Sequence, residues 1–185
     1  MKKPDNKAPK HLNGEIDIRQ MELGDLPVCF SIGEEIFTAE KWPNLYRTWD
    51  EYELLDSYAS ESELCLVAEI DGKIAGFALG TMIEKRRSAW MYGYLKWIGV
   101  RPDIKRSGIG TKLFDRLTEL FIERGARMML VDTEAENHEA IQFFRKQGFG
   151  QEIKHIYLSR NLSSHPGYLK RKAVLRKLKK GEIRN

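Results

Sequence analysis

The sequence predicts an α/β (α+β) domain in which helices cover both faces of one mixed central sheet. Strand-like patterns dominate the first half of the chain, and helix-like and strand-like patterns alternate in the second half. Asp71-Gly72 separates two apolar runs and is a strong signal for a hairpin. An apolar strand enters a glycine-bearing loop and then an amphipathic helix over residues 98–113. A hairpin requires antiparallel strands, and a strand–helix–strand unit requires parallel ones, so the sheet should be mixed.

The N-terminal third is expected to hold one strand and two helices. Residues 1–13 resemble a disordered basic tail. Apolar and charged residues alternate over 15–21, which predicts a first strand. Asp25 precedes a leucine-proline pair and is a suitable N-cap for a helix that begins there. A loop over 38–48 should then lead into a short helix over 49–58.

The later elements are predicted from hydrophobic period and from turn residues. They are, in chain order, strands over 63–70, 73–83 and 89–100, a helix over 110–124, a strand over 127–133, a helix over 137–147 and a strand near 151–158. Gly148 directly follows the last of these helices, which is the usual position of a glycine C-cap.

The loop before the helix at 110 has the chemistry of an anion site. The first turn of a helix presents backbone N–H groups, and the helix dipole favours negative charge there. Gly108 and Gly110 lack a Cβ and allow a phosphate to approach, while Lys105 and Arg106 add positive charge. Other nucleotide loops do not fit, because neither the P-loop spacing nor the three-glycine dinucleotide fingerprint is present. Taken alone, the same glycines also suit an ordinary helix start.

A second motif follows at a fixed distance. The strand over 127–133 is followed by Asn137, Ala140, Phe144 and the pair Gly148-Phe149. Together the two segments resemble the GNAT superfamily of acyl-CoA-dependent N-acyltransferases. The general similarity covers about residues 15–160, and the specific motifs lie within residues 97–149.

The resemblance implies a fold and a coenzyme site. The fold would be a mostly antiparallel GNAT-like sheet whose splayed strand pair opens beside the coenzyme. The pantetheine arm would pair with the strand end at Ile98, Gly99 and Val100, and Gly99 would suit a bulge next to a ligand. The loop amides would hold the pyrophosphate of acetyl-CoA, and Asn137 would reach the pantetheine in addition to capping its helix. The implied loop residues are Lys105, Arg106, Ser107, Gly108, Ile109, Gly110 and Thr111.

Two positions depart from the family pattern. Lys105 replaces the usual glutamine or arginine and keeps a positive charge. Phe144 replaces the usual tyrosine, whose hydroxyl in many relatives is assigned as the acid that protonates the leaving thiolate. A phenyl ring can pack against the coenzyme but cannot donate a proton. The departure affects the expected mechanism more than the expected activity.

Asp132 and Tyr94 are the two candidates for the catalytic base. Relatives carry the base either on the strand before the loop, where Tyr94 stands, or at the end of the following strand, where Asp132 stands. We favour Asp132, which lies between apolar Val131 and a helix start and should be partly buried. A solvent-exposed strand end and a packed tyrosine are the structural alternatives.

The segment after the first predicted helix is rich in aromatic and acidic residues. Two interpretations remain open: a lid over an amine acceptor, or a helix face packed on the sheet. The aromatic residues concerned are Phe37, Trp42, Tyr46, Trp49, Tyr52 and Tyr58.

Composition predicts a cytoplasmic domain over 14–162 with a basic tail over 163–185 that is helical in part. Residues 163–185 carry a net charge of +7 and residues 1–10 a net charge of +3, whereas the whole chain carries +4. The rest of the chain therefore carries −6, and an acidic domain suits cationic substrates. No apolar run is long enough for a membrane span, and the N-terminus does not resemble a signal peptide. Cys29 and Cys65 are expected to be core thiols, and no metal site is predicted.

These observations favour an N-acetyltransferase that transfers the acetyl group of acetyl-CoA to a primary amine by direct attack in a ternary complex. The acceptor would be a small molecule or a protein amine, and a homodimer stays open. The alternative is a non-catalytic acyl-CoA-binding sensor or scaffold whose basic tail binds a partner. We do not expect membrane binding, and nucleic-acid binding is the weakest hypothesis because no aromatic residues follow Tyr168 in the tail.

Overall fold

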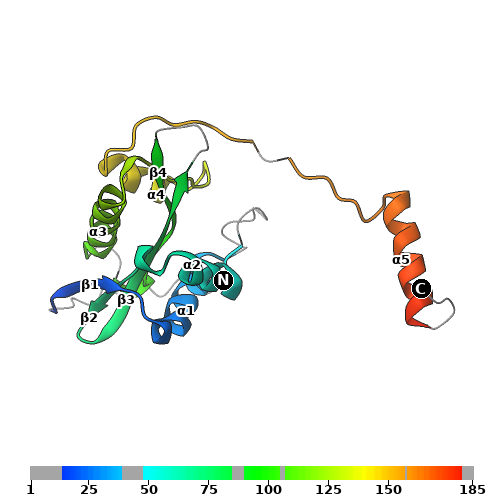
Figure 1. The fold of residues 1–185 in the computed structure, drawn as a ribbon, viewed down its shortest axis with the longest axis horizontal. Coiled ribbons are helices and arrows are strands. Elements are labelled where there is room, and N and C mark those ends of the chain that lie inside the picture. Colours follow the sequence, from blue (N-terminus) through cyan, green and yellow to red (C-terminus); the bar gives the residue numbers. More distant parts are fainter. Residues whose placement is uncertain (1–13, 39–47, 85–89, 105–106, 157, 181–185) are drawn as a thin grey trace, which may run out of the picture. The chain divides into compact units, whose positions relative to one another are not determined.

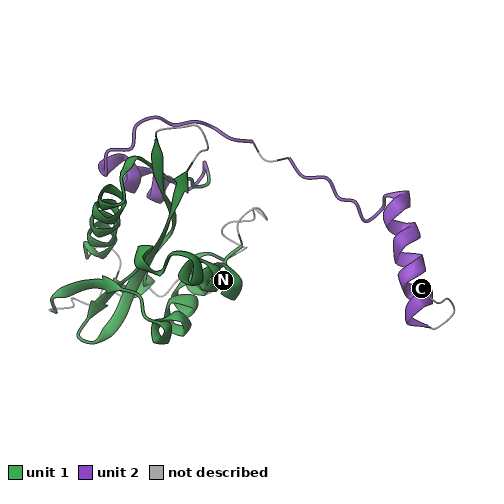
Figure 2. Ribbon diagram, viewed as in Figure 1, with its two compact units in different colours: residues 1–134 green, residues 135–185 purple. Residues whose placement is uncertain are grey.

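The computed structural model describes residues 14–38, 48–84, 90–104, 107–156 and 158–180 (Figure 1). The expected tail over 1–13 and most of the expected loop over 38–48 lie outside these residues. The chain forms two compact units, residues 1–134 and residues 135–185 (Figure 2). The division at residue 162 proposed from the sequence stays a prediction. Among the described helices, none is both long and apolar enough to cross a membrane.

The first unit is built on a five-stranded sheet with the order β1-β2-β3-β4-β5. Neighbouring strands are antiparallel except for β4 and β5, which are parallel. The mixed, mostly antiparallel sheet predicted from the sequence is therefore confirmed. The strands are β1 Ile16–Gln20, β2 Cys65–Ile70, β3 Lys73–Glu84, β4 Met91–Val100 and β5 Ala126–Leu130.

Helices cover both faces of this sheet. The helical elements of the first unit are η1 Leu23–Asp25, α1 Leu26–Ile36, α2 Glu51–Glu61, η2 Ser62–Leu64, η3 Pro102–Ile104 and α3 Ile109–Glu123. Helix α3 packs so closely on one face that a Cβ added to Gly80 or Gly93 would lie within 2.7 Å of the Phe121 ring. On the other face, α1 and α2 share a buried core with β2, β3 and β4.

Aromatic side chains fill the core beneath α1 and α2. The ring of Trp49 lies 5.1 Å from that of Phe77 and 5.3 Å from that of Trp97, and Phe37 lies 4.7 Å from Trp97. For Phe37 and Trp49 the packed-helix interpretation is therefore correct and the lid interpretation is wrong. Trp42 and Tyr46, for which the same two interpretations were open, lie outside the described residues. Tyr52 is exposed.

The predicted hairpin forms between β2 and β3. Asp71 and Gly72 both take positive φ values, 50° and 71°, as a two-residue turn of the primed type requires. The turn matches the right-handed twist of the strands it connects, which is why this dipeptide signal is reliable.

A bulge in β4 changes the face on which its side chains lie. Leu95 pairs with Gly80 and Trp97 pairs with Leu79, so Lys96 is the extra residue. Gly93 faces α3 before the bulge, whereas Trp97 joins the α1–α2 core after it. The bulge expected at Gly99 is thus misplaced, since Gly99 pairs regularly with Phe77. At Gly99 a Cβ would lie 3.2 Å from the Phe77 ring, so close packing explains this glycine.

The second unit contains α4 His138–Lys146 and α5 Pro166–Lys179. Asn137 caps α4 by accepting a hydrogen bond from the amide of Ala140 at 3.2 Å, and Gly148 follows at φ 92°. The strand predicted near 151–158 is not formed in residues 151–156 or at Leu158, and its apolar side chains are exposed. A strand is stable only beside a hydrogen-bonding neighbour, and the described part of this unit contains no other strand.

Candidate functional site

The loop before α3 has the open geometry expected of an anion site. Gly108 is the N-cap residue of α3 and takes φ 84°, the left-handed region that favours glycine. A Cβ added there would have no heavy atom within 4 Å, so the space above the loop is open. Ile109 is buried and fixes the helix start, while Ser107 is exposed. Lys105 and Arg106, also predicted for this site, lie outside the described residues.

The start of α3 lies against the end of β4. A Cβ added to Gly76 on β3 would lie 2.6 Å from the carbonyl oxygen of Gly99 and 3.3 Å from the Ile109 side chain. Ile98, Gly99 and Val100 all pair with β3. The loop and the strand end assigned to one coenzyme site are therefore neighbours within the first unit.

The ladder between strands β4 and β5 ends at Tyr94, because β5 itself ends at the opposite residue, Leu130. Their parallel ladder runs from Met91 opposite Ala126 to Tyr94 opposite Leu130, whereas β4 continues to Val100. The second half of β4 is thus paired with β3 but not with β5. This geometry agrees with the splayed strand pair expected from the sequence.

The two candidate bases meet at the end of this ladder. The hydroxyl of Tyr94, on β4, donates a hydrogen bond to Oδ1 of Asp132, which follows β5. Tyr94 is half-buried. Asp132 is exposed, so the expected partial burial is wrong: β5 ends at Leu130 and the chain has already left the sheet at this position.

Sequence reasoning missed a polar cluster on the other side of the β4 bulge. Lys96 Nζ lies 2.9 Å from Glu53 Oε1 and donates to Ser57 Oγ at 2.9 Å. The indole of Trp97 also donates to Glu53 Oε1, at 3.1 Å. These contacts fasten α2 to β4 two residues beyond Tyr94. No sequence signal marks Lys96 as the bulged residue, because the alternating pattern of β4 continues through it.

Asn137 and Phe144 belong to the second unit. The carboxamide oxygen of Asn137 is engaged in capping α4, as predicted. Phe144 is buried, and its ring lies 5.3 Å from Phe143 and 5.6 Å from Phe149.

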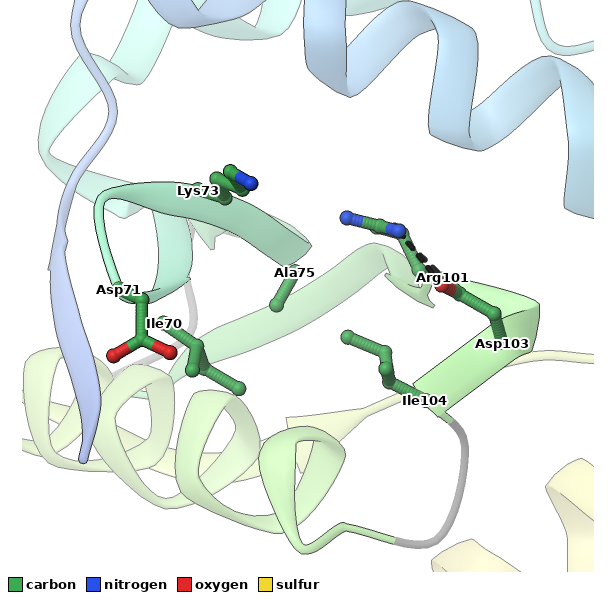
Figure 3. Close-up of a pocket in the computed structure, with 7 residues that line it drawn as sticks. All are labelled: Ile70, Asp71, Lys73, Ala75, Arg101, Asp103 and Ile104. Carbon is green, nitrogen blue, oxygen red and sulfur yellow. Dashed lines mark hydrogen bonds and ion pairs between the residues drawn. The ribbon is translucent and has the colours of Figure 1, made fainter. Parts of the chain in front are cut away.

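A separate cavity of about 160 Å³ lies at the end of the β2–β3 hairpin (Figure 3). It is smaller than the roughly 300 Å³ at which small-molecule sites begin. Arg101 forms an ion pair with Asp103 at 2.7 Å beside it. None of the predicted site residues lines this cavity. Its lining consists of Ile70, Asp71, Lys73, Ala75, Arg101, Asp103 and Ile104.

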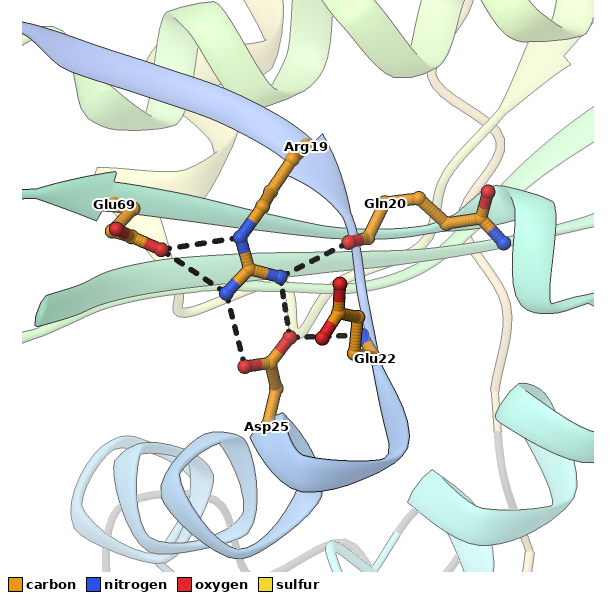
Figure 4. Close-up of polar contacts among 5 residues, drawn as sticks. All are labelled: Arg19, Gln20, Glu22, Asp25 and Glu69. Carbon is orange, nitrogen blue, oxygen red and sulfur yellow. Dashed lines mark hydrogen bonds and ion pairs between the residues drawn. The ribbon is translucent and has the colours of Figure 1, made fainter. Parts of the chain in front are cut away.

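A part-buried ion-pair network joins β1, β2 and the start of α1 (Figure 4). Arg19 binds both carboxylate oxygens of Asp25, at 2.6 and 3.0 Å, and donates to Glu69 at 3.1 Å. Asp25 also accepts from the amide of Glu22 at 2.8 Å. Asp25 is the N-cap residue of α1, as predicted, but its side chain makes no capping hydrogen bond to α1, because the carboxylate binds Arg19 and the amide of Glu22 instead. Hydrogen bonding to Arg19 lowers the pKa of Asp25.

Both cysteines are buried free thiols, as predicted. Burial raises the pKa of Cys29 and of Cys65 to about 12. A thiol in this state is a poor nucleophile, so neither cysteine is a candidate for catalysis.

Comparison with known proteins adds family and fold. Residues 34–149 match the family model described as "Acetyltransferase (GNAT) family". The acetyltransferase SG1711 of Sodalis glossinidius is 26% identical over 137 residues, which cover 73% of this chain and 92% of that protein.

Solved structures show the same fold at low identity. An aminoglycoside N-acetyltransferase, AAC(6')-Iy in complex with CoA, has a TM-score of 0.61 at 21% identity and covers 80% of this chain and 96% of its own. A Trypanosoma brucei acetyltransferase has a TM-score of 0.59 at 18% identity, covering 79% of this chain and 100% of its own.

Proposed function

Since the chain belongs to the GNAT acetyltransferase family, we propose that it transfers the acetyl group of acetyl-CoA to a primary amine by direct attack in a ternary complex. The observations that carry the proposal are the open space at Gly108, at the start of α3, and the end of the β4–β5 ladder at Tyr94. The backbone amides from Arg106 to Thr111 would bind the pyrophosphate, and the edge of β4 beyond Tyr94 would bind the pantetheine arm.

The coenzyme fits the residues that are described. Gly108 leaves space for a phosphate above the helix start. Among the described residues, the ladder of β4 with β5 stops at Tyr94, and an extended ligand can pair with the edge of a strand. Acetyl-CoA would supply the activated thioester, while the protein positions the amine and accepts its proton.

We infer that the acceptor is a cationic amine. Residues 50–61, which include α2, carry five carboxylates and no lysine or arginine. In the described contacts, Lys96 forms an ion pair with only one of these five carboxylates, that of Glu53. Several of the similar solved structures are named aminoglycoside acetyltransferases, one of them in complex with sisomicin. An aminoglycoside-type polyamine is therefore the first acceptor to test.

Phe144 supports a second candidate, a non-catalytic acyl-CoA sensor. Its phenyl ring cannot protonate a leaving thiolate. Turnover separates the two functions: an enzyme releases CoA in the presence of an amine, whereas a sensor binds acetyl-CoA without consuming it.

Calorimetry with acetyl-CoA tests the coenzyme site through Gly108→Glu. This change places bulk and negative charge where the pyrophosphate would lie, and we expect binding to be lost. Gly72→Glu is the matched control, because Gly72 also has positive φ and open space around its Cα but lies in the β2–β3 hairpin. Both variants carry similar backbone strain, of about 1–2 kcal/mol, so only the loop variant should lose affinity. Equal affinity in Gly108→Glu and wild type would refute the site.

Release of free CoA in the presence of an amine panel tests the activity. The panel should contain an aminoglycoside, spermidine and a lysine-containing peptide, with mass spectrometry of the products. Acetylated amine is expected. Acetyl-CoA binding without any acetylated product would favour the sensor.

A further inference from the structure

The geometry points to Tyr94 and Asp132 acting together as one proton relay, not as alternative bases. This inference rests on the proposed acetyl transfer and assigns the route of its proton. The family resemblance implies that some relatives carry the catalytic base at the position of Tyr94 and others at the position of Asp132. The structure joins the two side chains with a hydrogen bond.

The pair lies where the ladder between β4 and β5 ends. Tyr94 is the last residue of β4 in the ladder with β5, where it pairs with Leu130. Asp132 follows Leu130 by two residues. The hydrogen bond between Tyr94 and Asp132 therefore lies at the end of this ladder, beyond which the thioester would lie. The bond is at the surface, so an acceptor arriving from solvent reaches it directly.

The direction of the hydrogen bond sets the direction of proton transfer. The phenol donates to the carboxylate, so Asp132 is the acceptor at the end of the relay. A phenol oxygen also accepts hydrogen bonds, which allows Tyr94 to receive a proton as it passes its own on. The ammonium first releases one proton to solvent. The nitrogen of the free amine then bonds to the thioester carbon as the carbonyl electron pair moves to oxygen, an N–H proton moves to the Tyr94 oxygen, and the Tyr94 proton moves to Asp132 Oδ1.

The same pair can return this proton to sulfur. When the carbon–sulfur bond breaks, the electron pair stays on the thiolate. The proton on Asp132 passes back to Tyr94 as the Tyr94 proton goes to sulfur, which gives the amide, free CoA thiol and the original pair. No other acid is required, and this accounts for a phenylalanine at position 144.

A double-mutant cycle tests the relay with the full-length chain. The variants are Tyr94→Phe, Asp132→Asn and the double variant, assayed with acetyl-CoA and the best amine of the panel. Each single change should lower kcat/KM on the order of 100-fold, as is typical when a general acid or base is removed. The double variant should be no slower than the singles, because either change breaks the same relay.

Two further measurements separate a relay from a structural role. Acetyl-CoA affinity should be unchanged in all three variants. The deficits of both single variants should shrink together at high pH, where hydroxide can take the N–H proton and the thiolate can leave unprotonated. Tyr92→Phe removes a hydroxyl two residues earlier on β4, and Asp115→Asn neutralises an exposed carboxylate on α3; both should retain wild-type rates.

The relay would be overturned if the loss of kcat/KM in the double variant equalled the product of the two single losses. A wild-type rate in Tyr94→Phe alone or in Asp132→Asn alone would also overturn it. These outcomes leave the proposed activity intact. Wild-type protein that binds acetyl-CoA but acetylates no amine would instead refute the activity and the relay together.

Discussion

Phe144 is the residue at which this chain departs most clearly from its family. Its ring is buried between aromatic neighbours of the second unit, so packing alone can maintain it. If the Tyr94–Asp132 pair returns the proton to sulfur, a hydroxyl at position 144 adds little to the reaction.

Phe144→Tyr should therefore change kcat by much less than the roughly 100-fold associated with a general acid. Steady-state kinetics with acetyl-CoA and an amine measures this effect. Phe143→Tyr adds the same hydroxyl at the neighbouring position of α4 and serves as the control. A large gain in Phe144→Tyr alone would show that the natural protein lacks an acid it needs, and would support the sensor.

The sequence allowed the candidate bases to be named but not to be connected. The family resemblance implied the positions of Tyr94 and Asp132, whereas their contact depends on where β5 ends. Lys96 was missed for a similar reason: an added residue in β4 is visible only once the pairing with β3 is known. Register and strand ends arise from tertiary pairing, which local periodicity does not encode.

At the scale of elements, Arg19 joins three segments that are separate in sequence. Its guanidinium holds Asp25 at the start of α1 and Glu69 on β2, beside a register shift between Ala68 and Glu69. The side chain of Asp25 is mostly buried, so its charge depends on this partner. The network therefore links the start of α1 to β1 and β2.

Asp25→Asn should lower the free energy of unfolding by about 1–3 kcal/mol at neutral pH, because it weakens a part-buried charged hydrogen bond. The lowered pKa of Asp25 means that its contribution is present above the pKa of the unfolded state and is lost as pH falls through the folded one. Wild-type stability should thus fall in acid more steeply than that of Asp25→Asn. Urea unfolding followed by circular dichroism over a pH series measures both effects.

Asp103→Asn is the matched control for this prediction. Its ion pair with Arg101 is more exposed, with side-chain exposures of 47% and 37%, and should contribute less than about 1 kcal/mol. Equal stability losses in the two variants would contradict the special role of the Arg19 network.

Elements with local signals were predicted well, and the element that depends on a distant partner was not. The hairpin follows from two turn residues, and α3 follows from its apolar period and its glycine start. The segment 151–158 has the composition of a strand, yet Ile153, Ile156 and Leu158 are at least 79% exposed. β-propensity describes suitability for a pleated surface and does not supply the neighbouring strand.

At the scale of the whole molecule, charge is segregated along the chain. Helix α5 and Lys180 together carry seven lysine or arginine residues and no acid, whereas the segment around α2 is acidic. The residues of α5 are exposed except for Leu178, which is partly buried. The residues proposed for coenzyme binding and for the relay all precede this helix.

Truncation after Leu162 should therefore leave acetyl-CoA affinity and kcat within about twofold of the full chain, if residues 14–162 form the catalytic domain. The motif residues end at Phe149 and the family match ends at the same position, so the deleted residues contribute no proposed ligand. Calorimetry and CoA release measure the two quantities. A second truncation after Glu134 removes α4 with Asn137 and should abolish coenzyme binding. If the truncation after Leu162 keeps its affinity but loses turnover only with polycationic acceptors, the basic tail takes part in acceptor selection and the boundary at residue 162 is wrong.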